Sequence, residues 1–286
     1  VHAVRGVNFT VGNGEVLGIV GESGSGKSVT SMAIMGLLDE SAKIEGSVEI
    51  HGVEVLGRSD AYMSQIRGKV LSMVFQDPLS ALTPVYTIGD QLVEALQIHQ
   101  KMSKSAAATR AMELLSLVGI PNPEVRFKSF PHEFSGGMRQ RVMIAMAIAN
   151  DPDLIIADEP TTALDVTIQA QILQLLKKMQ VKYDLTILLI THDLGVVANI
   201  ADRVAVMYAG DIVEIGTADD IYYDPRHPYT WALLSSMPQM GVKGEDLFNI
   251  VGTPPNLFAE IRGDAFAPRN PQALKIDFVR RPPYFT

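Results

Sequence analysis

Short apolar runs alternate along this chain with longer stretches in which apolar residues recur every three or four positions. The runs lie at residues 16–20, 70–75, 154–157 and 186–190. Uninterrupted apolar runs of this length are typical of strands buried in a parallel sheet, whereas the wider spacing is typical of helices that bury one face. The pattern predicts an α/β fold with a parallel core, to which the strands and helices from Leu154 to about Ile215 contribute.

Two regions depart from this alternation. Residues 46–50 and 53–56 are separated by a His-Gly pair, which predicts a hairpin in an antiparallel patch. Residues 88–150 have helical spacing almost throughout, with Pro121 and Pro123 placed where one helix has to end before the next begins. This stretch therefore predicts a helical insertion in the sheet domain.

The last part of the chain is rich in proline. Nine of the 16 prolines follow residue 224, at positions 225, 228, 238, 254, 255, 268, 271, 282 and 283. Proline cannot continue a helix or a central strand, so this density predicts a loop-rich region. We expect one domain over 1–215, with the helical insertion at about 88–150, and an accessory region over 216–286.

A glycine-rich segment, Gly21–Ser28, directly follows the first apolar run and precedes a stretch with helical spacing. Such a segment turns tightly and points successive N–H groups at phosphate oxygens, while Lys27 reaches the outer phosphates and Ser28 ligates Mg²⁺. The following helix is expected to bury a face made of Val29, Met32, Ala33, Gly36 and Leu37. The alternative, a glycine-rich turn with an incidental lysine, is disfavoured by the strand before it and the helix after it.

A second glycine cluster begins at Ser135, which lies where a helix N-cap belongs, and continues with Gly136 and Gly137. The expected face of this helix consists of Met138, Val142, Ala145, Met146 and Ala149. The segment is another helix start suited to an anion. Taken alone, it would be interpreted as an ordinary N-cap in a helical domain.

The apolar run at 154–157 ends in two adjacent carboxylates, Asp158 and Glu159. Neighbouring strand residues point in opposite directions, so we expect Asp158 to hold the Mg²⁺ shell and Glu159 to face an attacking water. The run at 186–190 leads to His192, where a sensor of the γ-phosphate is needed. Solvated carboxylates at a strand end and a structural histidine are the alternatives.

In this order, the motifs resemble those of the nucleotide-binding subunits of ABC transporters. The matching elements are the Walker A loop Gly21–Ser28, Gln76, the signature Ser135–Gln140, the Walker B residues Asp158 and Glu159, the D-loop Ala163–Asp165 and the switch His192. The resemblance covers nearly the whole chain. It implies a P-loop NTPase (RecA-like) core with an antiparallel β patch, an inserted helical subdomain and a loop-rich C-terminal extension.

The resemblance also implies roles for individual residues. Glu159 would be the general base and His192 the γ-phosphate sensor, with Lys27 on the phosphates and Gln76 coupling the metal to the transporter interface. The residues expected to bind ATP are Gly21, Ser23, Gly24, Ser25, Gly26, Lys27, Ser28, Val29, Ser135, Gly136, Gly137 and Asp165. The expected Mg²⁺ ligands are Ser28, Gln76 and Asp158.

Within the family, the signature variant with Met138 and Arg139 is similar to that of the ATPases that serve peptide or nickel importers. Three segments of the tail, 223–230, 252–257 and 263–271, resemble the terminal extension of the same subunits. We therefore expect an ATPase that powers the uptake of di- or oligopeptides, with nickel or another small solute as the alternative cargo.

Similar tails often carry cysteines that hold an iron–sulfur cluster. This chain contains no cysteine and has Asp264, Asn270 and Asp277 at those positions. Hard oxygen-type side chains cannot replace the thiolates that such a cluster needs. We therefore expect no iron–sulfur cluster.

The start of the chain also departs from the family pattern, which places an adenine-stacking aromatic residue before the Walker A strand. His2 and Phe9 are the candidates, but Phe9 alternates with Val7 and Val11 as part of a core face would. We assign no adenine platform. Because the first residue is Val1 and not methionine, we expect the platform to lie upstream of it.

Composition limits the remaining classes of function. Hydrophobic residues make up 47% of the 286 positions and charged residues 20%, the balance of a chain with a substantial core. The apolar runs are shorter than the roughly 20 residues that span a bilayer, and no basic-then-apolar leader begins the chain. The net charge of −8 argues against broad nucleic-acid binding. A place on the cytoplasmic face of the cell membrane rests on the family resemblance.

The P-loop and the signature belong to different lobes, so a single chain can hardly close both over one nucleotide. The resemblance implies that two ATPase chains, identical or sister, dock head to tail and drive transmembrane permease subunits, which an external solute-binding protein supplies. The irregular segment 77–84 after Gln76 is a candidate contact for the permease, and an ordinary loop is an equal alternative.

Other classes of ATPase fit less well. A chromosome-maintenance enzyme would separate its Walker motifs by a long coiled coil, but no sustained heptads lie between Gly26 and Asp158. A soluble ABC protein that acts on ribosomes would usually join two such units in one chain. A binding module that uses ATP only as structural glue is opposed by Glu159 and His192.

Overall fold

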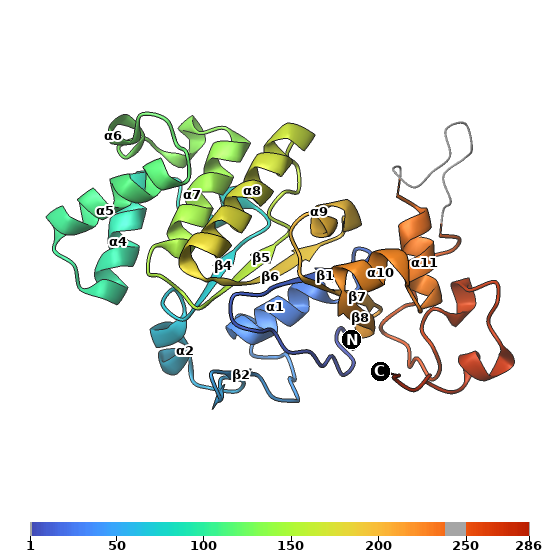
Figure 1. Ribbon diagram of the computed structural model, residues 1–286. Coiled ribbons are helices and arrows are strands. Elements are labelled where there is room, and N and C mark those ends of the chain that lie inside the picture. Colours follow the sequence, from blue (N-terminus) through green and yellow to red (C-terminus); the bar gives the residue numbers. More distant parts are fainter. Residues whose placement is uncertain (1, 238–249, 286) are drawn as a thin grey trace. The chain divides into compact units, whose positions relative to one another are not determined.

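A computed structural model describes residues 2–237 and 250–285 and divides the chain into two compact units. The first, called here the P-loop unit, comprises the described residues of Val1–Thr10, Leu17–Thr30 and Thr191–Thr286. The second, called the helical unit, comprises Val11–Val16 and Ser31–Ile190. Figure 1 labels the elements of both.

The helical unit contains three parallel strands: β4 (Leu71–Val74), β5 (Leu154–Asp158) and β6 (Thr186–Thr191). In their register, Leu71 pairs with Leu154 and Leu154 with Thr186. These strands coincide with three of the predicted apolar runs, and their side chains are almost all buried. The helices α7 (Gly136–Ile148) and α8 (Val166–Tyr183) lie along them (Figure 1). The carboxyl ends of β4 and β5 thereby bring the residues that follow them to one edge.

The predicted helical insertion is confirmed. It contains α4 (Ile88–Gln100), α5 (Lys104–Leu117), the short α6 (Pro123–Arg126) and the 3₁₀ turn η1 (Pro131–Glu133). The side chains of Thr87 and Ser103 cap the first two helices by accepting backbone N–H groups. The break between α5 and α6 contains Pro121 and ends at Pro123, as the sequence predicts.

The predicted hairpin forms but is shorter than expected, with β2 (Glu49–Ile50) paired antiparallel to β3 (Val53–Glu54). His51 and Gly52 both have positive φ, which suits a tight hairpin turn. Two further helices, α2 (Asp60–Ile66) and α3 (Pro78–Ala81), were not predicted. The carboxylate of Asp77 caps α3 through the amide of Leu79.

The P-loop unit contains β1 (Val16–Val20), which runs parallel to β7 (Arg203–Tyr208). The next strand, β8 (Asp211–Thr217), is antiparallel to β7. The expectation of a parallel core continuing to Ile215 is therefore wrong for this last strand. Ala209 and Gly210 have φ values of 49° and 82°, so the chain reverses in a two-residue turn that leaves no room for a crossover.

Two predicted helix faces are wrong in part. In α1 (Lys27–Met35), Thr30 and Ser31 are buried, whereas Met32 is 36% exposed and Leu37, beyond the helix, is 41% exposed. The hydroxyl of Thr30 donates to the carbonyl of Gly26 at 3.0 Å, so a polar residue is accommodated on the buried face. Apolar spacing alone therefore selected the wrong side of this helix.

The face predicted for α7 is too narrow. Val142, Ala145 and Ala149 are buried as expected, but Met138 and Met146 are only partly so. The helix also buries Gln140, Met143, Ile144, Ala147 and Ile148. A helix that is enclosed on most sides belongs to the interior of its unit, and its N-terminus carries the signature.

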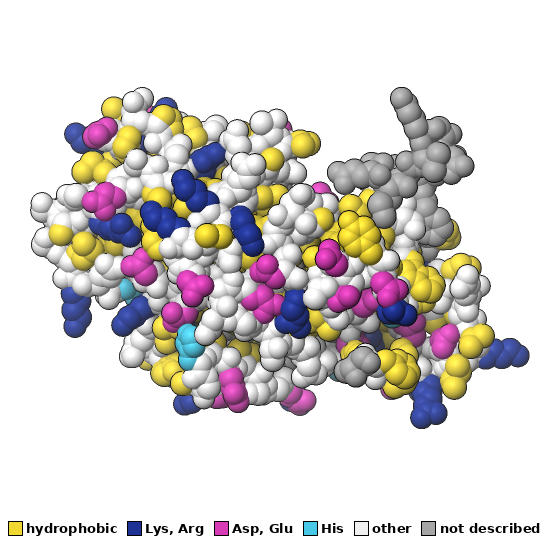
Figure 2. Space-filling model, in the orientation of Figure 1, with side chains coloured by type: hydrophobic (Ala, Val, Ile, Leu, Met, Phe, Trp, Pro, Cys, Tyr) yellow, Lys and Arg dark blue, Asp and Glu magenta, His cyan; other side chains and the backbone are white. Residues whose placement is uncertain are grey.

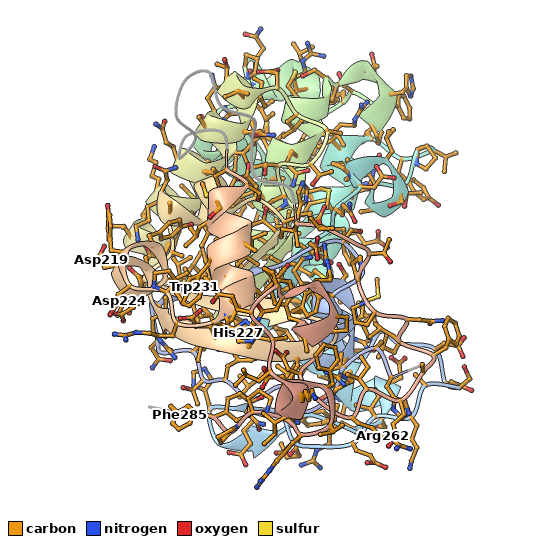
Figure 3. All side chains as sticks on the ribbon, turned by 90° about the vertical axis from the view of Figure 1, so that its right-hand side faces the viewer. Asp219, Asp224, His227, Trp231, Arg262 and Phe285 are labelled. Atoms are coloured by element: carbon orange, nitrogen blue, oxygen red, sulfur yellow. The ribbon has the colours of Figure 1, made fainter. Side chains whose placement is uncertain are left out.

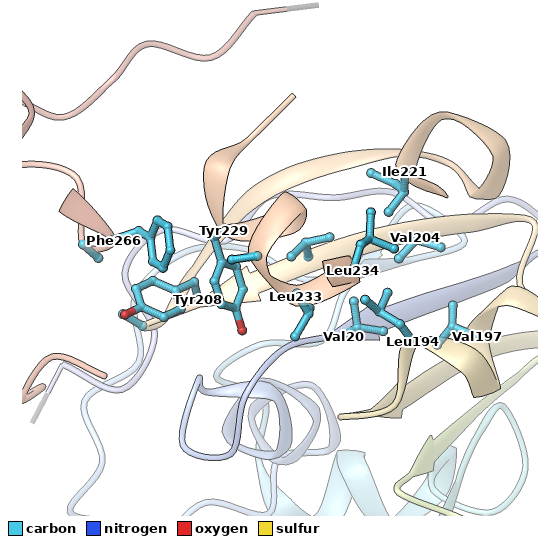
Figure 4. Close-up of a cluster of buried hydrophobic side chains, with 14 residues drawn as sticks. Val20, Leu194, Val197, Val204, Tyr208, Ile221, Tyr229, Leu233, Leu234 and Phe266 are labelled. Carbon is cyan, nitrogen blue, oxygen red and sulfur yellow. The ribbon is translucent and has the colours of Figure 1, made fainter. Parts of the chain in front are cut away.

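The loop-rich region is confirmed, and it shares a hydrophobic core with the rest of the P-loop unit. Its regular elements are α10 (Ala218–Tyr223), α11 (Pro228–Ser235) and the 3₁₀ turns η2 (Ala267–Arg269) and η3 (Lys275–Phe278). Figure 4 shows the cluster in which Tyr229, Leu233 and Phe266 from this region meet Val204 and Tyr208 of β7. Segments far apart in the sequence are thus packed into one unit.

The predicted domain division at 215/216 stays a prediction. In the structure, this position falls inside β8. Pro238, one of the prolines that indicated the accessory region, lies outside the described residues. Among the described residues, no helix is long and apolar enough to cross a membrane. On the face shown in Figure 2, positive and negative side chains are interspersed and form no continuous basic surface.

Candidate functional site

The P-loop connects β1 to α1 in the P-loop unit. Gly24 has a φ of 79° and open space around its α-carbon, whereas a side chain at Gly26 would collide with the carbonyl of Ala3 at 2.5 Å. Glycine is therefore required at Gly24 for backbone conformation and at Gly26 for close approach. The N–H groups of the loop and of the first turn of α1 are suited to a phosphate group.

Lys27 is 4% exposed and lies inside the loop. Its ammonium donates to the carbonyls of Gly21 at 2.8 Å and Glu22 at 3.0 Å, and to the hydroxyl of Ser25 at 3.4 Å. The loop thus surrounds a single positive charge. This arrangement fits the triphosphate of a nucleotide, because an ammonium held among oxygen acceptors can transfer its donors to phosphate oxygens.

The rest of the P-loop unit braces the loop from two sides. The amide of Gly210, in the turn between β7 and β8, donates to the carbonyl of Ser25 at 2.8 Å. Arg5 holds that turn in place, since its amide donates to Gly210 and its Nε to the carbonyl of Ala209 at 3.0 Å. Of the other predicted phosphate-binding residues, Ser23 is exposed, and Ser28 and Val29 are partly buried.

His192 follows the last residue of β6 and belongs to the P-loop unit. Its side chain is exposed, whereas Thr191 before it is buried. The turn around it is fixed locally, because Asp193 caps α9 (Leu194–Ala198) and donates its amide to the hydroxyl of Thr191 at 3.1 Å. The imidazole is accordingly presented at the end of a buried strand.

The two Walker B carboxylates have different environments. Asp158 ends β5 and is 3% exposed, and one of its oxygens accepts from the hydroxyl of Ser31 at 3.5 Å. Glu159 lies beyond the strand in a left-handed conformation with a φ of 46°, so the simple strand alternation does not describe it. Its amide is anchored to the carbonyl of Ile190 at 2.8 Å. A strained backbone at this position aims the carboxylate.

The structure brings Gln76 and Glu159 together within the helical unit. The Gln76 side-chain amide donates to one carboxylate oxygen of Glu159 at 3.0 Å, and the hydroxyl of Thr162 donates to the same oxygen at 2.9 Å. A carboxylate held by these two donors keeps a fixed orientation, which suits a group that accepts a proton. Thr162 was not predicted as a site residue, although it lies between the Walker B residues and the D-loop.

The signature and the D-loop also lie together in the helical unit. Ser135 caps α7 by accepting the amide of Met138 at 3.4 Å, and Asp165 caps α8 by accepting the amide of Ile168 at 3.0 Å. A side chain at Gly137 would meet Ile168 at 2.7 Å, and one at Gly136 would meet Leu164 at 3.5 Å. Gly137 therefore allows the starts of α7 and α8 to approach closely, whereas a side chain at Gly136 would make an ordinary contact.

The three tail positions expected to replace cysteines have local structural roles. The carboxylate of Asp264 accepts the amide of Phe266 at 2.9 Å, and Asn270 accepts that of Gln272 at 3.0 Å. Asp277 accepts the amide of Leu274 at 2.7 Å. Oxygen acceptors that cap turns in this way do not offer the soft ligands of an iron–sulfur cluster.

The start of α11 is fixed by polar contacts around His227 (Figure 3). The imidazole Nδ1 accepts the amide of Tyr229 at 3.1 Å, and the amide of His227 donates to Glu214 at 3.0 Å. Burial lowers the pKa of His227 and raises that of Tyr229. Nearby, the indole of Trp231 donates to the carbonyl of Pro225 at 2.6 Å. These contacts fix the first turn of α11, which carries Tyr229.

Neither candidate for the adenine platform gains support. His2 is exposed, and its amide donates to the carbonyl of Leu257 at 3.2 Å. Phe9 is half-buried, as are Val7 and Val11, so its alternation continues but does not place it in the fully buried core. The platform stays unassigned.

Comparison with known proteins gives two family matches. Residues 4–162 match the family described as "ABC transporter", and residues 213–276 match the family described as "Oligopeptide/dipeptide transporter, C-terminal region". The oligopeptide transport ATP-binding protein OppD of Bacillus subtilis is 60% identical over 100% of this chain and 80% of its own length. The dipeptide transport ATP-binding protein DppD of the same organism is 57% identical over 96% of this chain and 83% of its own length.

Solved structures of ATP-binding cassettes are also similar. A dimeric, post-hydrolysis state of the cassette MJ0796 bound to ADP and Pi matches with a TM-score of 0.68 and 32% identity, over 76% of this chain and 90% of that one. CbiO1 of Clostridium perfringens, part of the transporter complex cbiONQ, matches with a TM-score of 0.66 and 27% identity, over 78% of this chain and 84% of that one.

Proposed function

This chain belongs to the ATP-binding subunits of ABC transporters, and we propose that it hydrolyses ATP to power the import of oligopeptides or dipeptides. The observation that carries the proposal is that one chain matches both the ATPase family and the C-terminal region of the oligopeptide/dipeptide transporters. The family, the P-loop NTPase fold and the ATPase activity predicted from the sequence are confirmed. A peptide cargo is favoured over nickel, since the similar subunits are named for peptide transport.

In the proposed reaction, the P-loop holds the phosphates of ATP. The backbone amides from Gly24 to Ser28 donate to phosphate oxygens, and the Lys27 ammonium moves its hydrogen bonds from the carbonyls of Gly21 and Glu22 to the outer phosphates. His192 then contacts the γ-phosphate. Phosphoryl transfer asks mainly for positioning and charge stabilisation, which this set of donors provides.

Glu159 is the proposed general base. Gln76 and Thr162 orient its carboxylate, which in this proposal faces the attacking water and takes its proton. Gln76 lies at the start of the segment that we assign to the permease contact. A change at that contact can therefore move one of the two donors that hold the base.

Three residues suit a Mg²⁺ ion by their chemistry: Ser28, Gln76 and Asp158 supply a hydroxyl, an amide oxygen and a carboxylate. When bound with ATP, the ion neutralises charge on the β- and γ-phosphates. The burial of Asp158 suits a residue whose charge is balanced by a metal.

A second ATPase chain completes the site in this proposal. Ser135, Gly136, Gly137 and Asp165 lie together, at two helix starts suited to an anion, and we assign them to the ATP held by the partner's P-loop. The similarity to a dimeric cassette bound to ADP and Pi supports this assignment. The partner is an identical or a sister chain.

The permease is proposed to contact an exposed apolar patch that follows Gln76. Leu79 is 55% exposed, Val85 72% and Tyr86 57%, and all three lie between Gln76 and the start of α4. Large apolar residues exposed within one short segment favour a protein partner over solvent. This docking would place the chain on the cytoplasmic face of the membrane, with the solute-binding protein acting through the permease.

The natural absence of cysteine allows a direct test of this contact. A Leu79→Cys or Val85→Cys variant in the assembled transporter should crosslink to a permease loop, because each carries the only thiol of the chain. Val181→Cys is the matched control, since Val181 is 70% exposed on α8, away from this segment. Crosslinking at Val181 but not at Leu79 or Val85 would reject the placement.

The function itself is tested by uptake. A strain that lacks this subunit should fail to accumulate labelled di- or oligopeptides, and the unchanged chain should restore uptake, whereas Glu159→Gln should not. Normal peptide uptake in the deletion strain, together with lost uptake of nickel or another solute, would contradict the peptide assignment.

A further inference from the structure

Polar contacts of Glu22 join the C-terminal extension to the P-loop. The carboxylate of Glu22 pairs with Arg269 of η2, at 2.6 Å and 3.0 Å from the two guanidinium nitrogens. Its backbone amide donates to the hydroxyl of Tyr229 on α11 at 2.9 Å, and its carbonyl accepts from Lys27. A single P-loop residue thus joins the extension to the lysine that serves the phosphates.

Arg269 is fully engaged in this contact. Besides Glu22, it donates to the hydroxyl of Tyr208 at 3.2 Å and to the carbonyls of Ile250 at 3.3 Å and Val251 at 3.0 Å. All five N–H donors of the guanidinium are therefore used. The side chain is only 5% exposed, and its pKa is raised, chiefly by the hydrogen bonds to Glu22. A lysine could not make this planar, two-pronged contact.

An aromatic cluster holds Tyr229 and Arg269, the two residues of the extension that contact Glu22, in place. Tyr208 and Tyr229 are fully buried, with ring centroids 4.4 Å apart, and Phe266 packs edge-on against Tyr208 at 5.5 Å (Figure 4). Pro254 and Pro255 line, together with Ser23–Ser25 of the loop, a cavity of only about 10 Å³. The extension therefore contacts the loop closely and over several residues.

The charge of Glu22 makes this contact relevant to nucleotide binding. A carboxylate on a loop that receives a triphosphate would repel it unless the carboxylate is neutralised and directed away. Arg269 does both, and a bidentate pair fixes direction as well as charge. We propose that Arg269 is a positioning residue for ATP binding, through which the C-terminal extension holds the P-loop in the form that accepts phosphate.

This inference rests on the proposed binding of ATP at the P-loop, and the test separates the two. The full chain and its Arg269→Gln, Glu22→Gln and doubly substituted variants would be titrated with Mg²⁺-ATP, with circular dichroism as the check of folding. Lys27→Ala reports whether ATP binds at the P-loop. Arg262→Gln is the matched control, because Arg262 lies in the same extension but is exposed and, among the described residues, pairs with the exposed Glu260.

Arg269→Gln should raise the Kd for ATP roughly 10- to 100-fold, because it leaves a carboxylate without its partner on the phosphate loop. Adding Glu22→Gln should return the Kd to within about threefold of the unchanged chain, because the unpaired charge is gone. In the assembled transporter, Arg269→Gln should raise the KM for ATP and leave kcat unchanged. A variant that merely folds less well would lower the apparent kcat instead.

A folded Arg269→Gln variant that binds ATP as tightly as the unchanged chain would overturn the inference, as would additive effects of the two substitutions. Failure of the unchanged chain to bind ATP would instead overturn the proposed function. If Arg269→Gln does not fold, hydrogen exchange decides. ATP should slow exchange over residues 264–279 in the unchanged chain and not in Glu22→Gln, because coupling between two sites is reciprocal. Exchange that ATP leaves unaltered would contradict the inference.

Discussion

The P-loop and the signature are both glycine-rich helix starts, yet their surroundings differ. The P-loop is enclosed: the turn at Gly210 holds Ser25, while Tyr229 and Arg269 hold Glu22. The signature has an exposed Ser135 whose described contact is its own cap, with Gly137 packed on Ile168 below it. In our proposal, the first is a complete anion site within one chain. The second is one half of a site, which a nucleotide on another chain would complete.

Glu159→Gln should separate binding from chemistry and have the largest effect. The amide cannot accept the proton of the attacking water, so turnover should fall on the order of 10²–10⁴-fold, whereas ATP binding at the enclosed P-loop should be unchanged. Steady-state hydrolysis and ATP titration of the same preparation provide the measurement. Unchanged hydrolysis would remove Glu159 from the role of base.

Matched substitutions of the two glycines sharpen the comparison. Gly26→Val should weaken ATP binding of the single chain by about 10²-fold, because its β-carbon would displace the loop from Ala3. Gly137→Val should leave that binding intact and lower hydrolysis in the assembled transporter by about 10²-fold, because it forces α7 away from Ile168.

The two glycine variants serve as each other's control in binding and hydrolysis assays. Both should keep their helical circular dichroism, which shows that a loss reflects a displaced site and not an unfolded chain. If Gly137→Val also abolished ATP binding by the isolated chain, the signature would serve the nucleotide of its own chain, and the distinction between the two helix starts would fail.

Thr162→Val should have a smaller effect. It removes one of the two hydrogen bonds to the Glu159 carboxylate, so kcat should fall roughly 3- to 10-fold with little change in KM. Thr167→Val is the control, because Thr167 is exposed on the following helix. A kcat equal to that of the control would mean that the Thr162 hydroxyl does not orient the base.

We expect the C-terminal extension to be held without an iron–sulfur cluster. The brace of the P-loop is built from hydrogen bonds and ring packing, and Asp264, Asn270 and Asp277 cap turns in the extension. Protein purified under anaerobic conditions should therefore contain no stoichiometric iron or acid-labile sulfide. Finding both in stoichiometric amount would show that the extension is held by a cluster instead.

The motifs could be predicted from the sequence because each is short and local. A strand, a glycine turn and a helix start are specified by neighbouring residues, so the P-loop and the cap at Ser135 were found directly. The buried face of α1 was misjudged for the same reason. Thr30 and Ser31 are polar by type but satisfied by local partners, which apolar spacing cannot indicate.

The contact between the extension and the P-loop could not be predicted. Glu22 and Arg269 are 247 positions apart, and a pair of single charges has no periodicity that would connect them. Glu22 lies in the Walker A loop and Arg269 in the tail segment 263–271, but no role was predicted for either residue. The contacts of Thr162 and Gln76 with Glu159 could not be predicted either, because they form only after the strands have been placed side by side.

The central claim is that the P-loop of one chain and the signature of another share one ATP. The most direct test is the mass in solution of Glu159→Gln by light scattering, with and without Mg²⁺-ATP, alone and mixed with the transporter's other ATPase subunit where it has one. The account predicts a complex of two ATPase chains that forms only with ATP and is lost when Gly137→Val is added. A chain that binds ATP yet stays a monomer in both mixtures would contradict it.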